Sequence, residues 1–323
     1  MPKRSFKQSL LITLKGIAMG AADVVPGVSG GTIAFISGIY QELISTIHSL
    51  DFGIFKSLKK EGFKTVWQQY NLGFLGALFT GIAISVLSLA KLITMLLGTY
   101  PILVWSFFFG LVLASIIYIA KQITRYSPKA IIALIIAALL SYSVTLAQPI
   151  ADTESIWFLF LAGFIAIIAM ILPGISGAFI LLLIGGYTVV IGAINQFTEA
   201  LSTFNWSSLG NALLKIGVFA VGAVAGLKVF SGVLNWMFKN HKNTTLAVLT
   251  GFMIGALNKI WPWKEVLQYR KNSHGDKIPF LEKSIFPDSF QGDPKVLEAI
   301  LFMLAGFMII FLMEYIANKK SPN

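Results

Sequence analysis

Pro26-Gly27-Val28-Ser29-Gly30-Gly31-Thr32 is the stretch that decides the fold, because a copy of it returns 147 residues later as Pro173-Gly174-Ile175-Ser176-Gly177-Ala178-Phe179. Both copies lie inside long apolar runs, where proline and glycine interrupt a helix. The offset continues beyond the motif, since Gly38 and Tyr40 fall on Gly185 and Tyr187. A helix-breaking motif that is repeated within apolar segments is typical of membrane transporters with internal repeats.

The composition is that of a membrane protein. Of the 323 residues, 56% are hydrophobic and only 12% are charged, whereas a soluble domain carries about 25% charged residues. Apolar stretches recur along the whole sequence, and the mean hydropathy is +0.79. We therefore expect one integral membrane domain over residues 1–323.

The excess of basic residues is explained by membrane topology. The net charge of +11 comes from lysines and arginines in short segments between apolar runs, which differs from the single basic patch of a nucleic-acid-binding protein. We therefore expect no nucleic-acid partner. The chain has no cysteine and its three histidines lie far apart, so neither a metal site nor a cofactor is expected.

The apolar segments fall into two sets of five. They span residues 9–25, 30–49, 71–98, 101–120, 128–147, 156–172, 176–197, 208–238, 243–261 and 294–317. The first set forms repeat 1, about 9–147, and the second forms repeat 2, about 156–318, with a polar insertion at about 262–292. Glycines also match at an offset of 141, where Gly76, Gly81 and Gly110 pair with Gly217, Gly222 and Gly251.

The distribution of lysine and arginine predicts the orientation in the membrane. Basic residues concentrate at both termini and at 56–64, 121–129 and 239–242, which are therefore expected on the cytoplasmic side. Each half is then predicted to begin with a re-entrant helical hairpin that is broken at its Pro-Gly-x-Ser-Gly turn. We predict an all-α integral membrane protein with an inverted-topology repeat of about five apolar segments per half and an extracytoplasmic insertion.

The two serines of the repeated motif precede apolar helices and are preferred N-cap residues. A helix that begins at Ser29 or Ser176 directs its N–H groups and the positive end of its dipole toward the turn. Two such helix N-termini that face each other would form an anion site at mid-membrane, because the glycines let a ligand approach. The alternative is that the glycines only permit tight helix packing and the prolines only turn the chain.

Asp23 is the acidic residue nearest to the first motif, and its counterpart in the second repeat is Met170. A carboxylate within the membrane is costly, so Asp23 is a candidate for proton coupling. The alternative is a structural cap or an ion pair with Lys15 or another lysine. Glu42 is a second candidate for proton coupling, although its place near a cytoplasmic segment end also fits a solvated carboxylate.

Lysines that interrupt apolar segments are candidates for contact with an anionic ligand. Lys91 and Lys228 occupy the equivalent third segments of the two repeats, which makes them the favoured phosphate partners. The alternative for each is an ion pair or an ammonium that extends to the membrane interface. Lys15 lies in the first segment and either contacts the ligand or extends its ammonium to the interface.

The stretch 16–32, Gly-Ile-Ala-Met-Gly-Ala-Ala-Asp-Val-Val-Pro-Gly-Val-Ser-Gly-Gly-Thr, resembles the signature of a bacterial membrane family. That family was formerly a domain of unknown function and is associated with polyprenyl-phosphate transport. The resemblance extends to the second motif at 172–177 and covers nearly the whole chain. It implies a multi-pass protein of the bacterial cytoplasmic membrane that moves undecaprenyl phosphate, the C55 lipid carrier, from the outer to the cytoplasmic leaflet for recycling in cell-envelope synthesis.

The resemblance also implies which positions bind the substrate. Besides Asp23, the positions that match the two family motifs are Pro26, Gly27, Ser29, Gly30, Gly31, Thr32, Pro173, Gly174, Ser176 and Gly177. Family members often have a serine where this chain has Ala178, so one hydroxyl donor is missing here.

The leading interpretation is a flippase that works by alternating access and holds the phosphate at the paired hairpin turns. A secondary transporter of a small soluble anion is the alternative. An enzyme that acts on lipid phosphates is a third interpretation, against which the lack of a histidine, cysteine or metal constellation argues, so no catalytic residue is assigned. The coupling ion, proton or sodium, and a homo-oligomeric state are left open.

Overall fold

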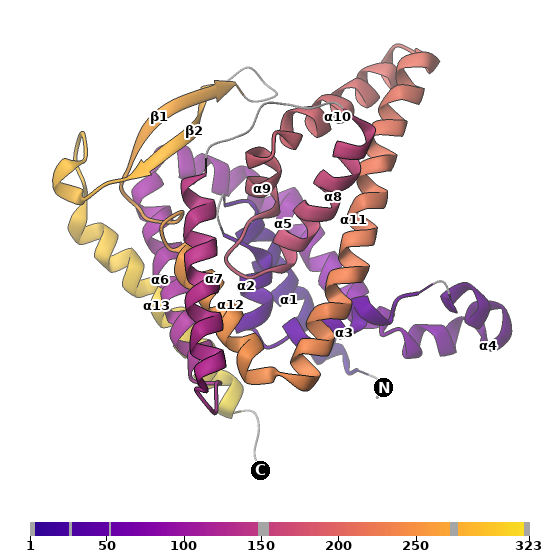
Figure 1. Cartoon of the computed structure of the whole chain (residues 1–323), viewed down its shortest axis with the longest axis horizontal. Helices are drawn as coiled ribbons and strands as arrows, with labels where there is room; N and C mark the ends of the chain where they lie inside the picture. The colour runs from indigo at the N-terminus through magenta and orange to yellow at the C-terminus, as the bar shows by residue number, and fades with distance from the viewer. Residues whose placement is uncertain (1–3, 26–27, 52, 148–154, 272–276, 320–323) are drawn as a thin grey trace.

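The structure, a computed structural model, describes residues 4–25, 28–51, 53–147, 155–271 and 277–319, and most of them are helical (Figure 1). The first half contains α1 (Phe6–Asp23), α2 (Gly30–Ile36), α3 (Tyr40–Ser49), α4 (Gly53–Gln69), α5 (Leu72–Thr99), α6 (Pro101–Ala120) and α7 (Pro128–Leu146). The second half contains α8 (Ile156–Ile171), α9 (Gly177–Leu183), α10 (Gly186–Ser202), α11 (Trp206–Asn240), α12 (Lys242–Ala256), β1 (Lys264–Lys271), β2 (Lys277–Ser284), a 3-10 turn (Pro287–Ser289) and α13 (Val296–Lys319).

Several helices are suited to a membrane. Among the described residues α5, α6, α7 and α11 are each long and apolar enough to cross one, and the bent pair α9–α10 passes the same test together. Large apolar side chains such as Leu87, Leu139 and Val224 are exposed on these helices, as expected where the surrounding solvent is lipid. The protein is therefore a multi-pass membrane protein.

The two halves pack according to the same pattern. α1 packs along α5 and α8 along α11, while α6 pairs with α13 and α7 with α12. A Cβ at Gly81 would clash with the Thr13 carbonyl, and a Cβ at Gly222 would clash with the Phe160 carbonyl. The two contacts are equivalent, because Gly81 and Gly222 are related by the offset of 141, and Thr13 and Phe160 by the offset of 147. The matched glycines therefore mark equivalent sites of close helix approach, whereas the inverted orientation of the halves stays a prediction.

The second segment of each half is a broken helix. The predicted segment 30–49 is interrupted between α2 and α3, and the predicted segment 176–197 is interrupted between α9 and α10 with a bend of 105°. Gly38 and Gly185, which are repeat equivalents, have φ angles of 75° and 78° at these breaks. Glycine adopts this left-handed backbone without the steric penalty of a Cβ. The breaks agree with two hairpins, and their re-entry into the membrane stays a prediction.

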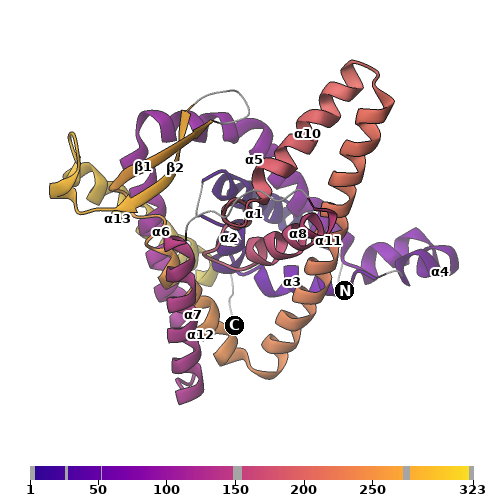
Figure 2. The ribbon, with the colours of Figure 1, turned by 45° about the horizontal axis from the view of Figure 1, so that its top comes forward.

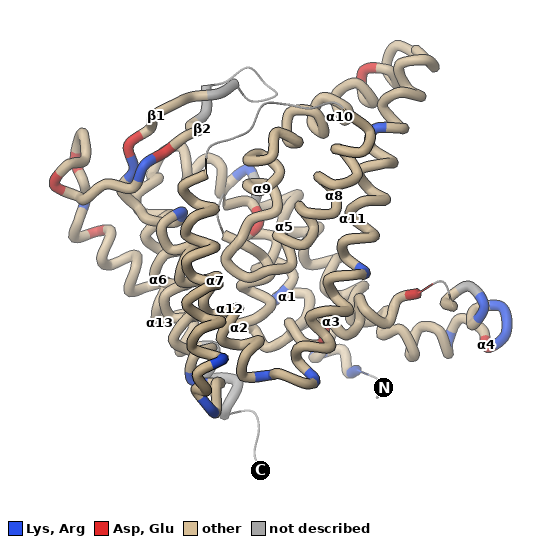
Figure 3. Tube along the Cα trace, viewed as in Figure 1, with Lys and Arg blue, Asp and Glu red and all other residues tan. Residues whose placement is uncertain are grey.

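α4 is a helix within a stretch where the sequence indicated only a loop. It projects from the helical body near the start of α1 in both views (Figures 1 and 2). Lysines gather on it (Figure 3), and Phe63 and Trp67 are exposed beside them. This combination is typical of a helix at a membrane–water interface.

The polar insertion forms an antiparallel β-hairpin, where the sequence predicted only a polar stretch. The hairpin lies at the opposite end of the molecule from α4 and the start of α1 (Figure 1). Trp261 and Trp263 pack with residues of α6 and α13 beneath it, and the Trp263 indole donates to the Pro294 carbonyl at 2.8 Å. We call the end of the molecule with β1–β2 the hairpin end, and the end with α4 and the start of α1 the terminal end.

Candidate functional site

α2 lies at the centre of the molecule, and all seven of its residues are buried. Ser29 is its N-cap, and the serine hydroxyl accepts a hydrogen bond from the Gly31 amide at 3.1 Å. The Asp23 carboxylate accepts from the Gly30 amide at 2.6 Å. A Cβ at Gly30 would lie 2.5 Å from the Asp23 carboxylate, which is why glycine is required there. Asp23 and Ser29 thus satisfy the free amides at the start of this helix.

The contacts at the start of α2 concern two predictions from the sequence, the role of Asp23 and the anion site at the helix amides. Asp23 acts as a structural cap for α2, although the residue as a whole is exposed. Of the first motif, Pro26 and Gly27 lie outside the described residues. The amides that were expected to cradle an anion are already bonded to side chains of the same motif.

The two copies of the motif meet, although they lie far apart in the sequence. The Gly174 amide donates to the Thr32 hydroxyl at 3.0 Å, and the Ser29 hydroxyl donates to the Met170 carbonyl at 3.2 Å. The Met170 carbonyl lies at the end of α8, where helix carbonyls lack an intrahelical partner. We call Ser29, Thr32, Met170 and Gly174 the motif junction. Its hydrogen bonds join the two halves, and the one between Thr32 and Gly174 is buried.

The second motif is held by close backbone packing. Gly174 has a φ of 87°, and a Cβ there would lie 2.9 Å from the Met253 Cα of α12. Ser176 caps α9 by accepting from the Phe179 amide at 3.4 Å. A Cβ at Gly177 would lie 2.6 Å from the carbonyl of Ala166 in α8. Pro173, which precedes Gly174, is buried in the same turn. Glycine therefore serves tight packing at both motifs, which was the alternative interpretation of these residues, and the serines serve as caps.

Two of the candidate lysines bind helix C-termini. The Lys15 ammonium donates to the Ser37 carbonyl at 2.6 Å, just after α2. The Lys228 ammonium donates to the His48 carbonyl and, at 2.6 Å, to the Leu50 carbonyl at the end of α3. Cations near a helix C-terminus complement its free carbonyls and its dipole. These contacts tie α1 and α11 to the first broken helix.

The remaining candidates lie elsewhere. Lys91 is exposed on α5. Glu42 forms an ion pair with Arg4 and accepts a hydrogen bond from the Asn71 side-chain amide at 2.8 Å. Arg4 also donates to Asn71 at 2.8 Å, so the three side chains form a closed polar network. Among the described residues no three His, Asp or Glu side chains lie close enough to hold a metal ion.

A polar pocket of about 410 Å³ lies between α2, α3, the end of α6 and the start of α12. Its polar lining comes from Tyr40, Gln41, Tyr118, Lys121, Gln122 and Lys242. The Tyr40 hydroxyl donates to the Ile171 carbonyl at 3.1 Å, which connects the pocket to the end of α8. In the sequence, Lys121 and Lys242 were interpreted only as markers of the cytoplasmic side. They lie at the end of α6 and the start of α12, which are equivalent helices of the two halves, and this placement could have indicated the pocket.

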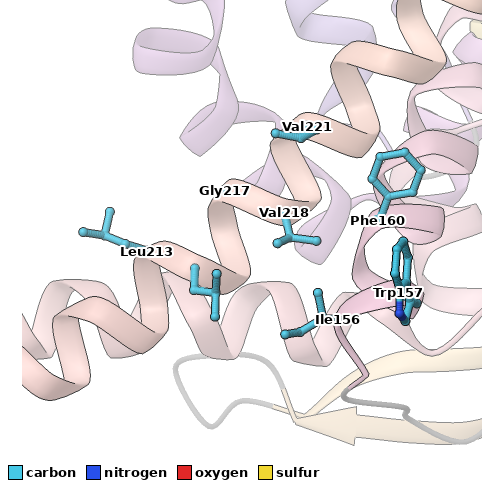
Figure 4. Close-up of a pocket in the computed structure, with 8 residues that line it drawn as sticks. Ile156, Trp157, Phe160, Leu213, Gly217, Val218 and Val221 are labelled. Carbon is cyan, nitrogen blue, oxygen red and sulfur yellow. The ribbon is translucent and has the colours of Figure 1, made fainter.

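Apolar pockets lie between α8 and α11. Figure 4 shows one of about 390 Å³ whose lining includes Trp157, Phe160 and Val221. A second pocket of about 450 Å³ is lined by α8, α10 and α11. Its lining is apolar apart from Lys215. Both pockets are open to the outside of the helical body, as a site for a hydrocarbon chain requires.

The sequence was compared with protein families and with known proteins. A family model described as undecaprenyl phosphate translocase-like matches residues 19–278. The chain belongs to this family. It is 44% identical over 310 residues to a polyprenyl-phosphate transporter of Vibrio cholerae serotype O1, which covers 95% of this chain and 96% of the relative.

A second relative is more distant. The chain is 33% identical over 261 residues to a polyprenyl-phosphate transporter of Staphylococcus aureus, covering 77% of this chain and 85% of the relative. No solved structure matches the chain significantly. The range matched by the family model contains both motifs and the motif junction, so the family resemblance expected from the sequence is confirmed.

Proposed function

We propose that this protein transports undecaprenyl phosphate across the bacterial cytoplasmic membrane, from the outer to the cytoplasmic leaflet, by alternating access. Membership of the undecaprenyl phosphate translocase-like family and two relatives named polyprenyl-phosphate transporters support the substrate. The carrier would thereby be recycled for cell-envelope synthesis. The positive-inside rule supports placing the terminal end, with both chain termini, in the cytoplasm.

The motif junction is the observation that carries this proposal. It is a small polar contact at the centre of a membrane protein, where the start of α2 meets the end of α8 and the turn that precedes α9. Separation of the two motifs would break few hydrogen bonds, and the glycines leave little side-chain volume in the way. We propose that the junction opens to one side at a time while the phosphate passes between the motif turns.

In this mechanism the phosphate competes with groups of the protein itself. Asp23 and Ser29 occupy the Gly30 and Gly31 amides in this structure. A phosphate at the opened junction would take over these amides, since an anion is stabilised near a helix N-terminus. Displacement of the Asp23 carboxylate would favour its protonation, which offers a route to proton coupling. Only the first half could couple to protons in this way, because the second half has Met170 at the position equivalent to Asp23.

The prenyl tail requires an apolar path that stays in contact with lipid. The pockets between α8 and α11 offer such a path on the flank of the second half. The polar pocket with Lys121 and Lys242 would receive the phosphate at the cytoplasmic side. In this arrangement the head group crosses through protein while the tail remains in the bilayer.

The transporter of a small soluble anion remains the second candidate function, because the polar pocket would also accept inorganic phosphate. The apolar pockets favour the lipid. The names of both relatives favour transport over an enzymatic activity.

The test is a leaflet assay in proteoliposomes that carry a radiolabelled polyprenyl phosphate. A soluble phosphatase outside the vesicles removes the phosphate only from the outer leaflet, so the protein should expose the inner pool to hydrolysis. Gly30→Leu should block this exposure, because its side chain would displace Asp23, whereas Gly76→Ala meets no neighbour within 4 Å and serves as the control. Hydrolysis no greater than in protein-free vesicles would contradict the proposal, and uptake of inorganic phosphate alone would favour the second candidate.

A further inference from the structure

Two lysines and one glutamate form a compact cluster at the hairpin end. The Lys259 and Lys264 ammonium groups lie 3.5 Å and 3.6 Å from the same Glu282 carboxylate oxygen. Lys259 follows α12, Lys264 begins β1 and Glu282 lies on β2. One carboxylate therefore serves two cations, and the cluster keeps a positive charge.

Lys264 is the unusual member of this cluster. Its side chain is only 7% exposed, and apart from the ion pair with Glu282 its ammonium makes no hydrogen bond among the described residues. The ammonium lies 3.5 Å from the centre of the Trp105 ring, which is a cation–π contact. An ammonium has three donors, and a buried one without an acceptor is costly. The site therefore offers unused donors to an anion.

The cluster is connected to the second motif. The Lys259 ammonium lies 4.6 Å from the centre of the Phe179 ring in α9, the helix that Ser176 caps. Lys264 contacts α6 through Trp105. The two lysines thus join the β-hairpin to both the second broken helix and the first half. An anion held between them would lie beside the helix that leads to the motif junction.

We propose that Lys259 and Lys264 form a binding site for a phosphate monoester, and that Glu282 occupies this site as an internal anion until the ligand replaces it. This inference rests on the proposed transport function and adds the residues that recognise the head group at the hairpin end. A phosphate dianion offers acceptors to both ammonium groups and balances their charge better than one carboxylate does. The displaced glutamate is only partly buried and can turn toward water.

The experiment measures binding of two probes, geranyl phosphate and inorganic phosphate, to the full-length protein in detergent by calorimetry. Lys264→Met and Lys259→Gln should each weaken binding at least about tenfold, since each removes a charged donor. Lys283→Gln is the matched control, because Lys283 is exposed and next to Glu282 on β2. It changes the net charge by the same amount and should leave binding unchanged.

The change in ligand affinity caused by Glu282→Gln distinguishes a competing carboxylate from a structural ion pair. If the carboxylate competes with the ligand, its removal tightens binding several-fold, whereas a purely structural ion pair would make this variant bind no better than the wild type. Tighter binding of geranyl phosphate than of inorganic phosphate identifies the lipid head group as the ligand, and equal binding identifies free phosphate. Binding that is unaffected by the Lys259 and Lys264 substitutions, in variants that keep the wild-type melting temperature, would overturn the inference while leaving the leaflet assay of the wild type unaffected.

Discussion

The Thr32 hydroxyl is the acceptor that links the first motif to the second, and its removal tests the role of the motif junction. Thr32 is fully buried and accepts from the Gly174 amide at 3.0 Å. Thr32→Val keeps the shape of the side chain but leaves this amide without a partner in the closed structure. A buried donor that loses its acceptor costs about 1–3 kcal/mol. The substitution should therefore destabilise the closed junction relative to states in which the amide is solvated.

This cost translates into a measurable change of population. A difference of about 1–3 kcal/mol raises the fraction of open junction by about 5- to 150-fold. Because the chain has no cysteine, Ile175→Cys introduces a single label site next to Gly174 at a buried position. The rate at which a water-soluble maleimide labels this cysteine should rise by the same factor in Thr32→Val.

The matched control is Thr32→Ser, which keeps the hydroxyl oxygen and loses only a methyl group. A buried methyl contributes about 0.8 kcal/mol to stability, but its loss leaves the acceptor for Gly174 in place. The labelling rate should therefore stay within about fourfold of the wild type. Equal labelling of the valine and serine variants would refute the assignment of the Thr32–Gly174 hydrogen bond as the contact that holds the junction closed.

Three further predictions concern other sites. Gly222→Ala should lower the melting temperature by several degrees, because its methyl group would clash with a carbonyl of α8, whereas Gly217→Ala on the same helix should not. Asp23→Asn keeps an acceptor for Gly30, so proteoliposome flux should persist but no longer respond to an imposed proton gradient. Burial lowers the pKa of Lys264 to about 8 from its ordinary value of 10.5. Between these values the unfolded chain binds more protons, so the free energy of unfolding should rise with pH, and Lys264→Met should flatten this rise in chemical-denaturation measurements.

Much of the architecture could be predicted because it depends on local patterns. The offset of 141 paired glycines of the two halves, and the structure puts two of these pairs, Gly81 with Gly222 and Gly110 with Gly251, at close helix contacts. Ser29 and Ser176 were recognised as N-caps, because a cap needs only the residues next to it. The family followed from the same motif.

The partners of the polar groups could not be predicted. A sequence shows that Lys15 and Lys228 interrupt apolar segments, but the carbonyls that they bind belong to other helices. Asp23 was weighed as a cap without its partner, which lies seven residues later at the Gly30 amide. The β-hairpin and α4 were missed because polar and amphipathic segments gain most of their stability from packing or from an interface.

The sequence by itself determined that this chain is a membrane protein with two related halves, each broken at a Pro-Gly-x-Ser-Gly turn, because hydropathy and backbone restrictions act on neighbouring residues. Only the tertiary structure decided that Thr32 and Ser29 contact Gly174 and Met170, and that Lys259 and Lys264 share Glu282. Contacts of this kind join groups that are distant along the chain, and they form because buried donors and acceptors must find partners wherever the packed helices place them.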